Sequence, residues 1–291
     1  EECIATARQA VDAGITLLDM APSYGDGEAE SVVGAAFDGK LPGDVRVTTK
    51  HRLGQTDPEA IEKNIRDGLE ESLKRLRVEQ VDLFFLHSNI IPNDFDASVY
   101  VTRPATRWWV YEEHFVPTCK KLVSEGKIGA WGITGIGVPE CLLRSFTLED
   151  KPAAVQCISN LIDSPGDLKY FPGSSRAREI IAKTKSIGAG VLGIRPVQGG
   201  ALTDAIDRDL PSGHGVVTDY AKTAKYRALA KELGTTPAAL AHRYALAMKG
   251  VDTVVLGCKN TVELKECVIA EANGPLELDI IARIDAAVLP N

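Results

Sequence analysis

The chain has 291 residues, of which 44% are hydrophobic and 25% charged, and its mean hydropathy is −0.05. This composition is typical of a soluble globular protein and excludes a disordered, fibrous or coiled-coil chain. Acidic residues outnumber basic ones by 40 to 33, and the resulting net charge of −7 argues against nucleic acid as a main partner.

The sequence shows no sign of a membrane or secreted location. Its longest apolar runs, such as residues 81–86, are far shorter than the roughly 20 residues that cross a bilayer. The first residues, Glu1-Glu2-Cys3, lack the basic and then apolar order of a signal peptide. We therefore expect a cytoplasmic protein with no membrane partner. Its six cysteines include no C-x-x-C pair, so we interpret them as reduced structural thiols.

Seven short runs of apolar or β-branched residues recur along the chain, and each is typical of a buried strand. They comprise residues 15–20, 45–49, 81–86, 128–133, 154–158, 190–194 and 253–256. Helical patterns lie between them. Residues 2–13 form the first helix, and a later one begins at Asp57-Pro58-Glu59, which combines a cap, a first-turn proline and an acid. Another begins at Thr236-Pro237 and ends at Gly250.

Apolar strands that alternate with helices predict a parallel sheet that is covered on both faces or closed on itself. Seven or eight such units favour the closed form, a (β/α)8 TIM barrel. No repeat and no linker-like segment divides the sequence, so we expect a single domain over residues 1–291.

In such a barrel the chemistry takes place where strands end and helices begin, so polar residues there are candidates. The first run leads to Asp19 and then Tyr24, the second is followed by Lys50, and the third by His87. Singly, each has a plainer explanation as a helix cap, a loop anchor, a surface charge or a buried histidine. Together they are more informative, because a closed barrel brings distant strand ends to one face.

These four side chains suit the reduction of a carbonyl. An ammonium beside a phenol favours the phenolate, so Lys50 would make Tyr24 a better proton donor near neutral pH. Asp19 could hold Lys50 charged and in place, and His87 could hydrogen-bond the oxygen that receives the proton. Together these residues would donate a proton to a carbonyl oxygen while a hydride source reduces the carbonyl carbon.

The sequence around these residues resembles the aldo-keto reductase family. The stretch GITLLDMAPSYGDGEAESVVGAAF is similar to the best-marked segment of that family, and the similarity continues through VDLFFLHS, GKIGAWGITG, AAVQCISN, GIRPVQGGAL and VVLGCKNTVELKE. The resemblance implies an NAD(P)H-dependent oxidoreductase that interconverts a small-molecule carbonyl and an alcohol. In it Tyr24 is the general acid, Asp19 and Lys50 tune it, and His87 orients the carbonyl.

Family members begin with a short hairpin and the first barrel strand. This chain begins instead at what we interpret as the first helix, residues 2–13. We therefore expect the hairpin and the first strand to be missing from this chain, because a barrel without them would expose unpaired strand edges.

The end of the chain carries a candidate cofactor site, since phosphate sites in such barrels often follow the last strands at a helix N-terminus. Gly257 permits close backbone approach there, Lys259 is a cation, and Asn260 can cap a helix over residues 260–265. An ordinary capped helix explains these residues equally well. The resemblance places Gly257, Lys259, Glu263 and Glu266 near the 2′ substituent or the adenine.

Three further cofactor contacts rest on the resemblance. It places Gln156 on the nicotinamide carboxamide and Thr134 at a hydroxyl position, and Arg195 lies next to the position where some members stack a tyrosine. Glu263 stands where arginine or glutamine is common, and its charge would repel a 2′-phosphate unless Lys259 offsets it. We predict NADP as the cofactor, with NAD as the second choice.

The segment after His87 is long, and long loops in compact domains are often functional. We predict that Trp108 and Trp109 line the substrate pocket and that Arg103 or Arg107 favours an anionic or polyhydroxylated substrate. Aromatic residues that pack on the barrel or on another subunit are the alternative. Two more loops, residues 161–175 and 203–218, are expected to close over the same face.

Three functions fit these residues. The first is the reductase. The second is a nucleotide-binding sensor or regulatory subunit with little turnover, like the family members that serve as regulatory subunits of some channels. The third uses Lys50 as a Schiff-base nucleophile in an aldolase barrel. A metal site is not predicted, because the five histidines show no ligand spacing. The specific substrate, and whether the chain forms a homo-oligomer, are left open.

Overall fold

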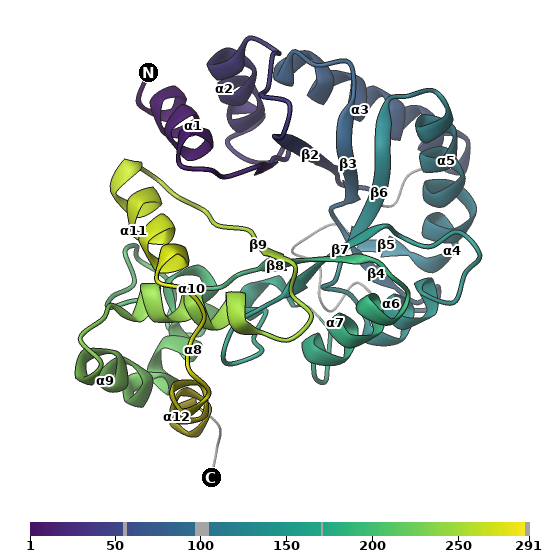
Figure 1. Cartoon of the computed structure of the whole chain (residues 1–291). Helices are drawn as coiled ribbons and strands as arrows, with labels where there is room; N and C mark the ends of the chain where they lie inside the picture. The colour runs from purple at the N-terminus through teal and green to yellow at the C-terminus, as the bar shows by residue number, and fades with distance from the viewer. Residues whose placement is uncertain (55–56, 97–104, 170, 289–291) are drawn as a thin grey trace. The chain divides into compact units, whose positions relative to one another are not determined.

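The structure is a computed structural model that describes residues 1–54, 57–96, 105–169 and 171–288 (Figure 1). The chain forms two compact units. Unit 1 comprises Glu1–Val155 and Lys259–Leu264, and unit 2 comprises Gln156–Cys258 and Lys265–Asn291. The organisation of residues 1–291 as one domain stays a prediction.

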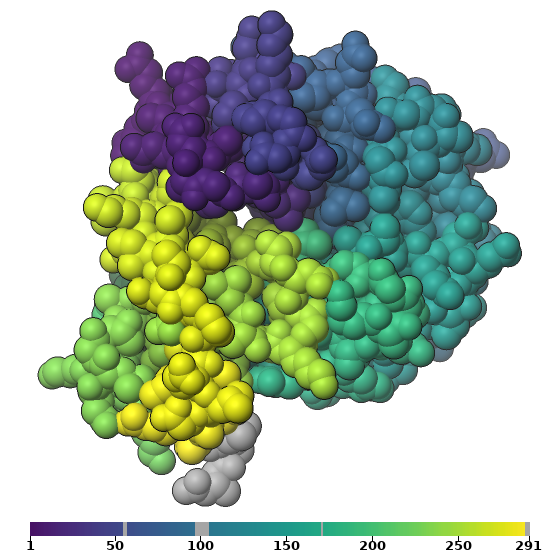
Figure 2. Space-filling model, in the orientation of Figure 1, coloured from purple at the N-terminus to yellow at the C-terminus, as the bar shows by residue number. Residues whose placement is uncertain are grey.

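Unit 1 is built on parallel strands that alternate with helices. The strand order is β1-β2-β3-β6, with β1 (Leu17–Asp19), β2 (Arg46–His51), β3 (Val81–Leu86) and β6 (Ile128–Thr134). The helices are α1 (Glu2–Asp12), α2 (Glu28–Phe37), α3 (Ile61–Leu76), α5 (Val116–Ser124) and α6 (Pro139–Ser145). Helix α1 packs on α2 and α2 on α3, and their purple to blue atoms lie together in Figure 2.

Unit 2 repeats the pattern. Strand β7 (Ala154–Ile158) contains the boundary between the units, and β8 (Gly190–Ile194) and β9 (Thr253–Val254) follow it in the sheet. The helices are α7 (Ala177–Ser186), α8 (Gly215–Lys222), α9 (Ala224–Glu232), α10 (Pro237–Ala247), α11 (Thr261–Ala272) and α12 (Leu278–Val288). Short helical turns η4 (Gly166–Leu168) and η5 (Gln198–Gly200) lie in its loops.

All seven predicted strands are present, in the alternating order that a (β/α)8 barrel requires. Residues 81–86, 154–158 and 190–194 are strands at the predicted bounds, whereas 15–20 and 253–256 shorten to three and two residues. The first element is α1, as predicted. In the described part of the chain, no helix is both long enough and apolar enough to span a membrane.

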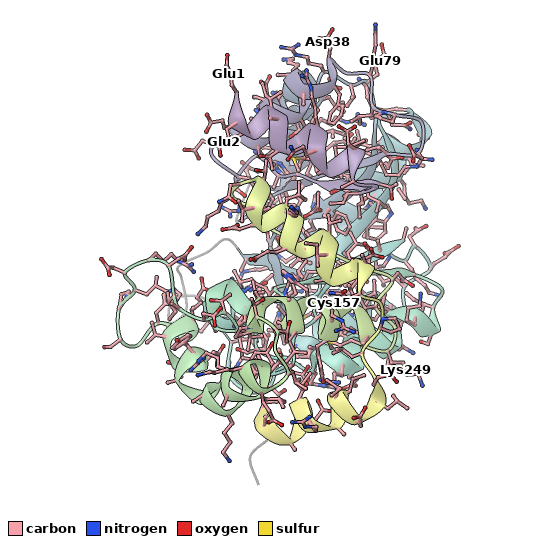
Figure 3. All side chains as sticks on the ribbon, turned by 60° about the vertical axis from the view of Figure 1, so that its left-hand side comes forward. Glu1, Glu2, Asp38, Glu79, Cys157 and Lys249 are labelled. Carbon is pink, nitrogen blue, oxygen red and sulfur yellow. The ribbon has the colours of Figure 1, made fainter. Side chains whose placement is uncertain are left out.

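The helix starts follow the predicted capping. A short turn, η1 (Pro58–Ala60), precedes α3, and Asp57 Oδ1 accepts a hydrogen bond of 3.1 Å from Glu59 N. Thr236 caps α10 in the same way, through Ala239 N at 3.1 Å. Figure 3 shows charged side chains such as Asp38 pointing outward from unit 1.

The long segment after β3 departs from the prediction of a loop. Strand β4 (Asn89–Ile91) pairs in parallel with β5 (Ala105–Arg107), and the chain continues through α4 (Trp108–Val110) and one π-helical turn, η3 (Tyr111–Phe115), into α5. Strands of three residues are too short for a visible alternation of apolar and polar residues. Their pairing depends on a partner distant in sequence, so local patterns missed it.

A buried carboxylate ties helices α2 and α3 to strand β2. Glu30 on α2 has no exposed surface and accepts hydrogen bonds from Thr49 Oγ1 at 2.5 Å and from Arg75 Nε at 2.6 Å. The two helices pack closely, because a Cβ on Gly34 would lie 2.1 Å from the carbonyl oxygen of Arg75. Since Thr49 precedes Lys50, this contact also fixes the strand that carries a predicted catalytic residue.

Candidate active site

The four predicted catalytic residues come from three neighbouring strands of unit 1. Asp19 is the last residue of β1, Lys50 lies near the end of β2, and His87 directly follows β3. Tyr24 lies in the turn between β1 and α2, where its amide donates to Ala21 O at 3.0 Å. Because the strands are parallel, their carboxyl ends lie side by side, and the structure brings all four residues together as predicted.

Lys50 is the centre of this group. Its side chain is buried, and Nζ donates hydrogen bonds to Asp19 Oδ2 at 2.6 Å, to the carbonyl oxygen of Met20 at 2.9 Å and to Tyr24 Oη at 3.2 Å. Three oxygen acceptors satisfy the three protons of an ammonium. The charged amine is therefore held in place by a buried ion pair and directed at the phenol oxygen.

Thr48 is a member of the site that the sequence did not reveal. Its Oγ1 donates a hydrogen bond of 2.7 Å to Asp19 Oδ1, and the residue has no exposed surface. Asp19 and Thr48 are paired in the register of β1 and β2. The only sequence signal was the spacing of two between Thr48 and Lys50, which places both side chains on one face of the strand.

Tyr24 presents its ring to solvent at the edge of the group. The residue is 40% exposed, whereas Lys50 beneath it is 1% exposed. The ring stands edge-on to that of His87, with centroids 5.9 Å apart and an interplanar angle of 89°. Strand pairing orients His87, whose amide donates to His51 O at 2.7 Å. A ligand from solvent can thus reach a phenol supported from behind by an ammonium, beside an imidazole.

Two predicted cofactor residues lie in buried positions on the strands. Thr134 ends β6, and its hydroxyl donates to the carbonyl oxygen of Leu86 at 2.9 Å, so it also steadies the residue before His87. Gln156 lies in β7 and is 2% exposed. Their contacts with a nicotinamide stay predictions.

Arg195 follows β8 in a strained, polar loop. It adopts a left-handed φ of +62°, which costs a residue with a side chain of this size about 1 kcal/mol or more. Its guanidinium donates to Gln198 Oε1 at 2.8 Å and pairs with Asp167 at 3.0 Å. Gln198 is fully buried and donates in turn to Asp219 at 2.8 Å. The loop is therefore held by side-chain hydrogen bonds rather than by a regular element.

The predicted clamp residues begin helix α11. Asn260 Oδ1 accepts from the amides of Val262 and Glu263, both at 3.0 Å, so the predicted cap is confirmed. Glu263 Oε2 accepts from the amide of Lys259, the residue before this cap, at 2.8 Å. This bond explains the unusual glutamate structurally, because the carboxylate closes the helix start. Gly257, Lys259 and Glu266 are exposed.

The predicted substrate residues Trp108 and Trp109 differ in burial. Trp108 is 3% exposed, its Nε1 donates to Glu112 at 2.5 Å, and Arg144 covers its ring at 4.2 Å. It therefore packs against other side chains of the protein, and its contact with a substrate stays a prediction. Trp109 is half-buried and stands edge-on to His114. Arg107 donates to backbone carbonyls, and Arg103 lies outside the described residues.

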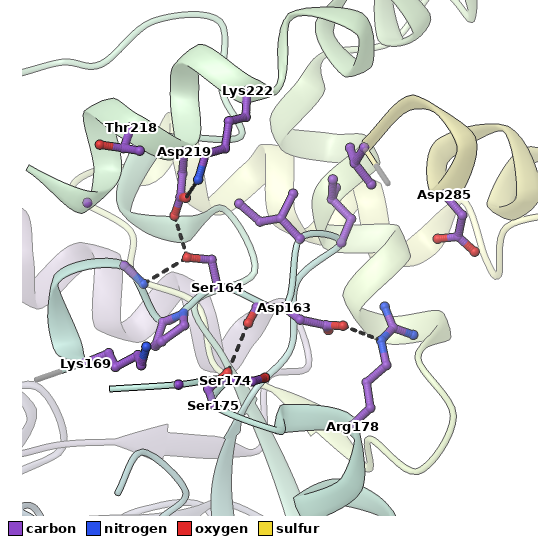
Figure 4. Close-up of a pocket in the computed structure, with 17 residues that line it drawn as sticks. Asp163, Ser164, Lys169, Ser174, Ser175, Arg178, Thr218, Asp219, Lys222 and Asp285 are labelled. Carbon is purple, nitrogen blue, oxygen red and sulfur yellow. Dashed lines mark hydrogen bonds and ion pairs between the residues drawn. The ribbon is translucent and has the colours of Figure 1, made fainter. Parts of the chain in front are cut away.

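A cavity of about 860 Å³ lies in unit 2 (Figure 4). The predicted loop 161–175 forms one wall, and α8, which begins at Gly215 within the other predicted loop, forms a second. Opposite charges pair along it, as in the contact of 2.7 Å between Arg178 and Asp163. Further charged lining residues are Lys169, Asp219, Lys222 and Asp285. The lining belongs to unit 2, whereas the four predicted catalytic residues belong to unit 1.

Comparison with known proteins places the chain in a family. Residues 1–289 match the model of the Aldo/keto reductase family, and the chain therefore belongs to it. L-galactose dehydrogenase of Arabidopsis thaliana is 26% identical over 299 residues, which cover 100% of this chain and 85% of that protein. A putative voltage-gated potassium channel subunit beta of Schizosaccharomyces pombe is 25% identical over 302 residues, covering 96% of this chain and 81% of that protein.

The fold agrees with this assignment. The crystal structure of an aldo/keto reductase from Klebsiella pneumoniae in complex with NADP and acetate matches with a TM-score of 0.70 at 21% identity, over 100% of this chain and 86% of that one. The predicted fold class is confirmed. So is the predicted enzyme class, an NAD(P)-dependent oxidoreductase.

Proposed function

We propose that this protein reduces an aldehyde or ketone to an alcohol, or catalyses the reverse reaction, with Tyr24 as the proton donor. The observation that carries the proposal is the contact of 3.2 Å between Lys50 Nζ and Tyr24 Oη, at a phenol that is 40% exposed above a buried ammonium. An acid catalyst must reach a ligand from solvent and must have its conjugate base stabilised. Tyr24 meets both conditions.

Each residue then has a defined task in the reduction. Tyr24 Oη gives its proton to the carbonyl oxygen as that oxygen gains negative charge. The Lys50 ammonium stabilises the phenolate that remains, and Asp19 keeps the ammonium charged and aimed. His87, beside the Tyr24 ring, donates a hydrogen bond to the same carbonyl oxygen and orients it. Water from the solvent returns the proton to Tyr24 after the product leaves.

We propose NADPH as the hydride donor, with NADH as the second choice. The exposed start of α11 fits the phosphate end of such a cofactor. A Cβ on Gly257 would meet no atom within 4 Å, so a ligand can approach the backbone there, and Lys259 next to it is an exposed cation. Asn260 and Glu263 would hold this helix start, and Thr134, Gln156 and Arg195 would contact the nicotinamide end. The solved relative that binds NADP supports the choice.

The test is oxidation of NADPH with a panel of aldehydes and ketones, with Tyr24→Phe as the variant. We expect turnover by the wild type and a loss of about a hundredfold to a thousandfold in Tyr24→Phe. NADPH affinity, followed by fluorescence titration, should stay within about threefold in that variant. Equal activity of both proteins would overturn the role of Tyr24.

A regulatory or sensor role is the second candidate, because the potassium channel subunit beta matches 96% of this chain. The same assay separates the two. Tight NADPH binding with no turnover on any carbonyl would favour the sensor. Borohydride trapping with a carbonyl substrate tests the Schiff-base alternative, and labelling of Lys50 would support an aldolase instead.

A further inference from the structure

Two cysteines and a histidine lie together in unit 2, outside the catalytic group. Cys258 follows β9 and Cys267 lies on α11, and their sulfur atoms are 3.9 Å apart. A disulfide needs about 2.05 Å between sulfurs. The pair is therefore within about 2 Å of bonding distance, which a small shift of an exposed loop can close. From the sequence alone, both cysteines are predicted to be structural thiols.

We propose that Cys258 and Cys267 are a redox-active pair that peroxide converts into an intramolecular disulfide. Their exposures suit the two roles such a pair needs. Cys258 is partly exposed, so an oxidant from solvent can reach it. Cys267 is 6% exposed and is the second thiol, which reacts with the oxidised Cys258. Reactive cysteines are generally accessible thiols with a second thiol close by.

The other buried cysteines offer a contrast. Burial raises the pKa of Cys157 to about 12 and that of Cys141 to about 11, so neither forms the reactive thiolate near neutral pH. Cys119 is fully buried, and burial raises its pKa as well. Cys3 is exposed on α1 and belongs to unit 1. The pair in unit 2 thus combines a partly exposed thiol with a second thiol 3.9 Å away.

His242 on α10 supplies a hydrogen-bond acceptor for the second thiol. Its Nδ1 lies 3.6 Å from Cys267 Sγ. Burial lowers the pKa of His242 to about 4, so the imidazole is neutral at pH 7 and has a nitrogen that accepts a hydrogen bond. The buried thiol therefore has an acceptor beside it at the moment it reacts.

The reaction balances with hydrogen peroxide as the oxidant. The Cys258 thiolate attacks one peroxide oxygen, which breaks the O–O bond, releases hydroxide and leaves a sulfenic acid. Cys267 then attacks the sulfenic sulfur, the S–S bond forms, and hydroxide leaves. That hydroxide takes the thiol proton of Cys267 and becomes water. In total, two thiols lose two electrons and two protons to one peroxide, and two waters form.

The bond would disturb the start of α11, a consequence that rests on the proposed function. Cys258 lies between Gly257 and Lys259, and the Lys259 amide donates to Glu263 at 2.8 Å in the present state. Drawing Cys258 toward Cys267 by about 2 Å strains that bond and the backbone next to the proposed phosphate contact. We expect oxidation to weaken NADPH binding by about tenfold, the effect of losing one or two hydrogen bonds.

Tryptic mapping tests the disulfide directly. Lys259 and Lys265 separate the two cysteines, so digestion without reductant leaves peptides 250–259 and 266–283 joined only by the predicted bond. After treatment of dilute protein with hydrogen peroxide, we expect the linked pair, and dithiothreitol should split it. Cys258→Ser and Cys267→Ser should abolish it, while Cys3→Ser should not. Unlinked peptides in the treated wild type, or a link to another cysteine, would overturn the proposal.

Fluorescence titration with NADPH tests the consequence separately. The oxidised wild type should bind NADPH about tenfold more weakly than the reduced protein, with recovery in dithiothreitol, and Cys258→Ser should bind equally well under both conditions. If the disulfide forms and the affinity for NADPH does not change, only the proposed effect of the disulfide on NADPH binding is overturned. If neither form binds NADPH, the proposed cofactor fails while the disulfide result stands.

Discussion

Thr48 and Asp19, on adjacent parallel strands, share a hydrogen bond of 2.7 Å that leaves the second oxygen of the carboxylate to Lys50 at 2.6 Å. The carboxylate therefore has both oxygens engaged and only one orientation. This makes Thr48 a positioning residue for Lys50, the proposed partner of the phenol, although Thr48 does not touch the phenol itself.

Replacement of Thr48 by valine should slow the reaction through Asp19. We expect kcat to fall about fivefold, the effect of losing about 1 kcal/mol of hydrogen bonding, with NADPH affinity unchanged. Thr48→Ser keeps the hydroxyl and should restore most of the rate. If serine and valine variants are equally slow, Thr48 acts only through packing.

Replacement of Lys50 by methionine tests the electrostatic role of the ammonium. Since Lys50 touches the phenol and not the proposed nucleotide contacts, kcat should fall by about a hundredfold or more while NADPH affinity stays within about threefold. Steady-state kinetics and fluorescence titration measure the two effects, with circular dichroism as a check on folding. Equal loss of activity and nucleotide binding would contradict the assignment.

The buried Glu30 should be important for stability. Glu30→Gln removes a charge that accepts from Thr49 and Arg75, so we expect a loss of about 2 to 3 kcal/mol in the free energy of unfolding. Glu71→Gln is the matched control, because its pair with Lys74 is exposed and an exposed pair adds little to the free energy of unfolding. Urea unfolding measures both, and similar losses in the two variants would refute the distinction.

Buried His242 should make the protein less stable in acid. Its folded pKa of about 4 lies below the ordinary value of 6.5, so between these values the unfolded chain binds a proton that the folded chain does not. Stability should therefore be unaffected above pH 6.5 and fall as the pH drops toward 4, by about 3 kcal/mol in total. His51, whose pKa burial also lowers, adds a change of the same sign.

Urea unfolding at pH 7.5 and pH 5.0 checks this prediction. The stability of His242→Asn should change less between the two pH values than that of the wild type, because the variant lacks the buried imidazole. Both proteins share His51 and the carboxylates, so the contributions of these groups to the pH dependence cancel in the comparison. An identical pH dependence in the two proteins would show that His242 does not couple to folding.

The sequence by itself determined the strands, the helix starts and the convergence of the four proposed catalytic residues. Runs such as residues 81–86 are apolar throughout, and a buried parallel strand is the local structure that such a run satisfies. The caps at Asp57 and Thr236 are equally local. Because parallel strands end at one edge, the positions of Asp19, Lys50 and His87 after three such runs already predicted their convergence.

Only the tertiary structure decided which other side chains meet. Thr48 reaches Asp19 through the register of two strands, and Glu30 reaches Arg75 across two packed helices. Cys258 and Cys267 approach each other because a loop and a helix fold back together. These contacts depend on registers and packing distances that no local pattern encodes, since propensity and periodicity describe one segment at a time. The same reason explains why Trp108, predicted at a substrate pocket, packs beneath Arg144.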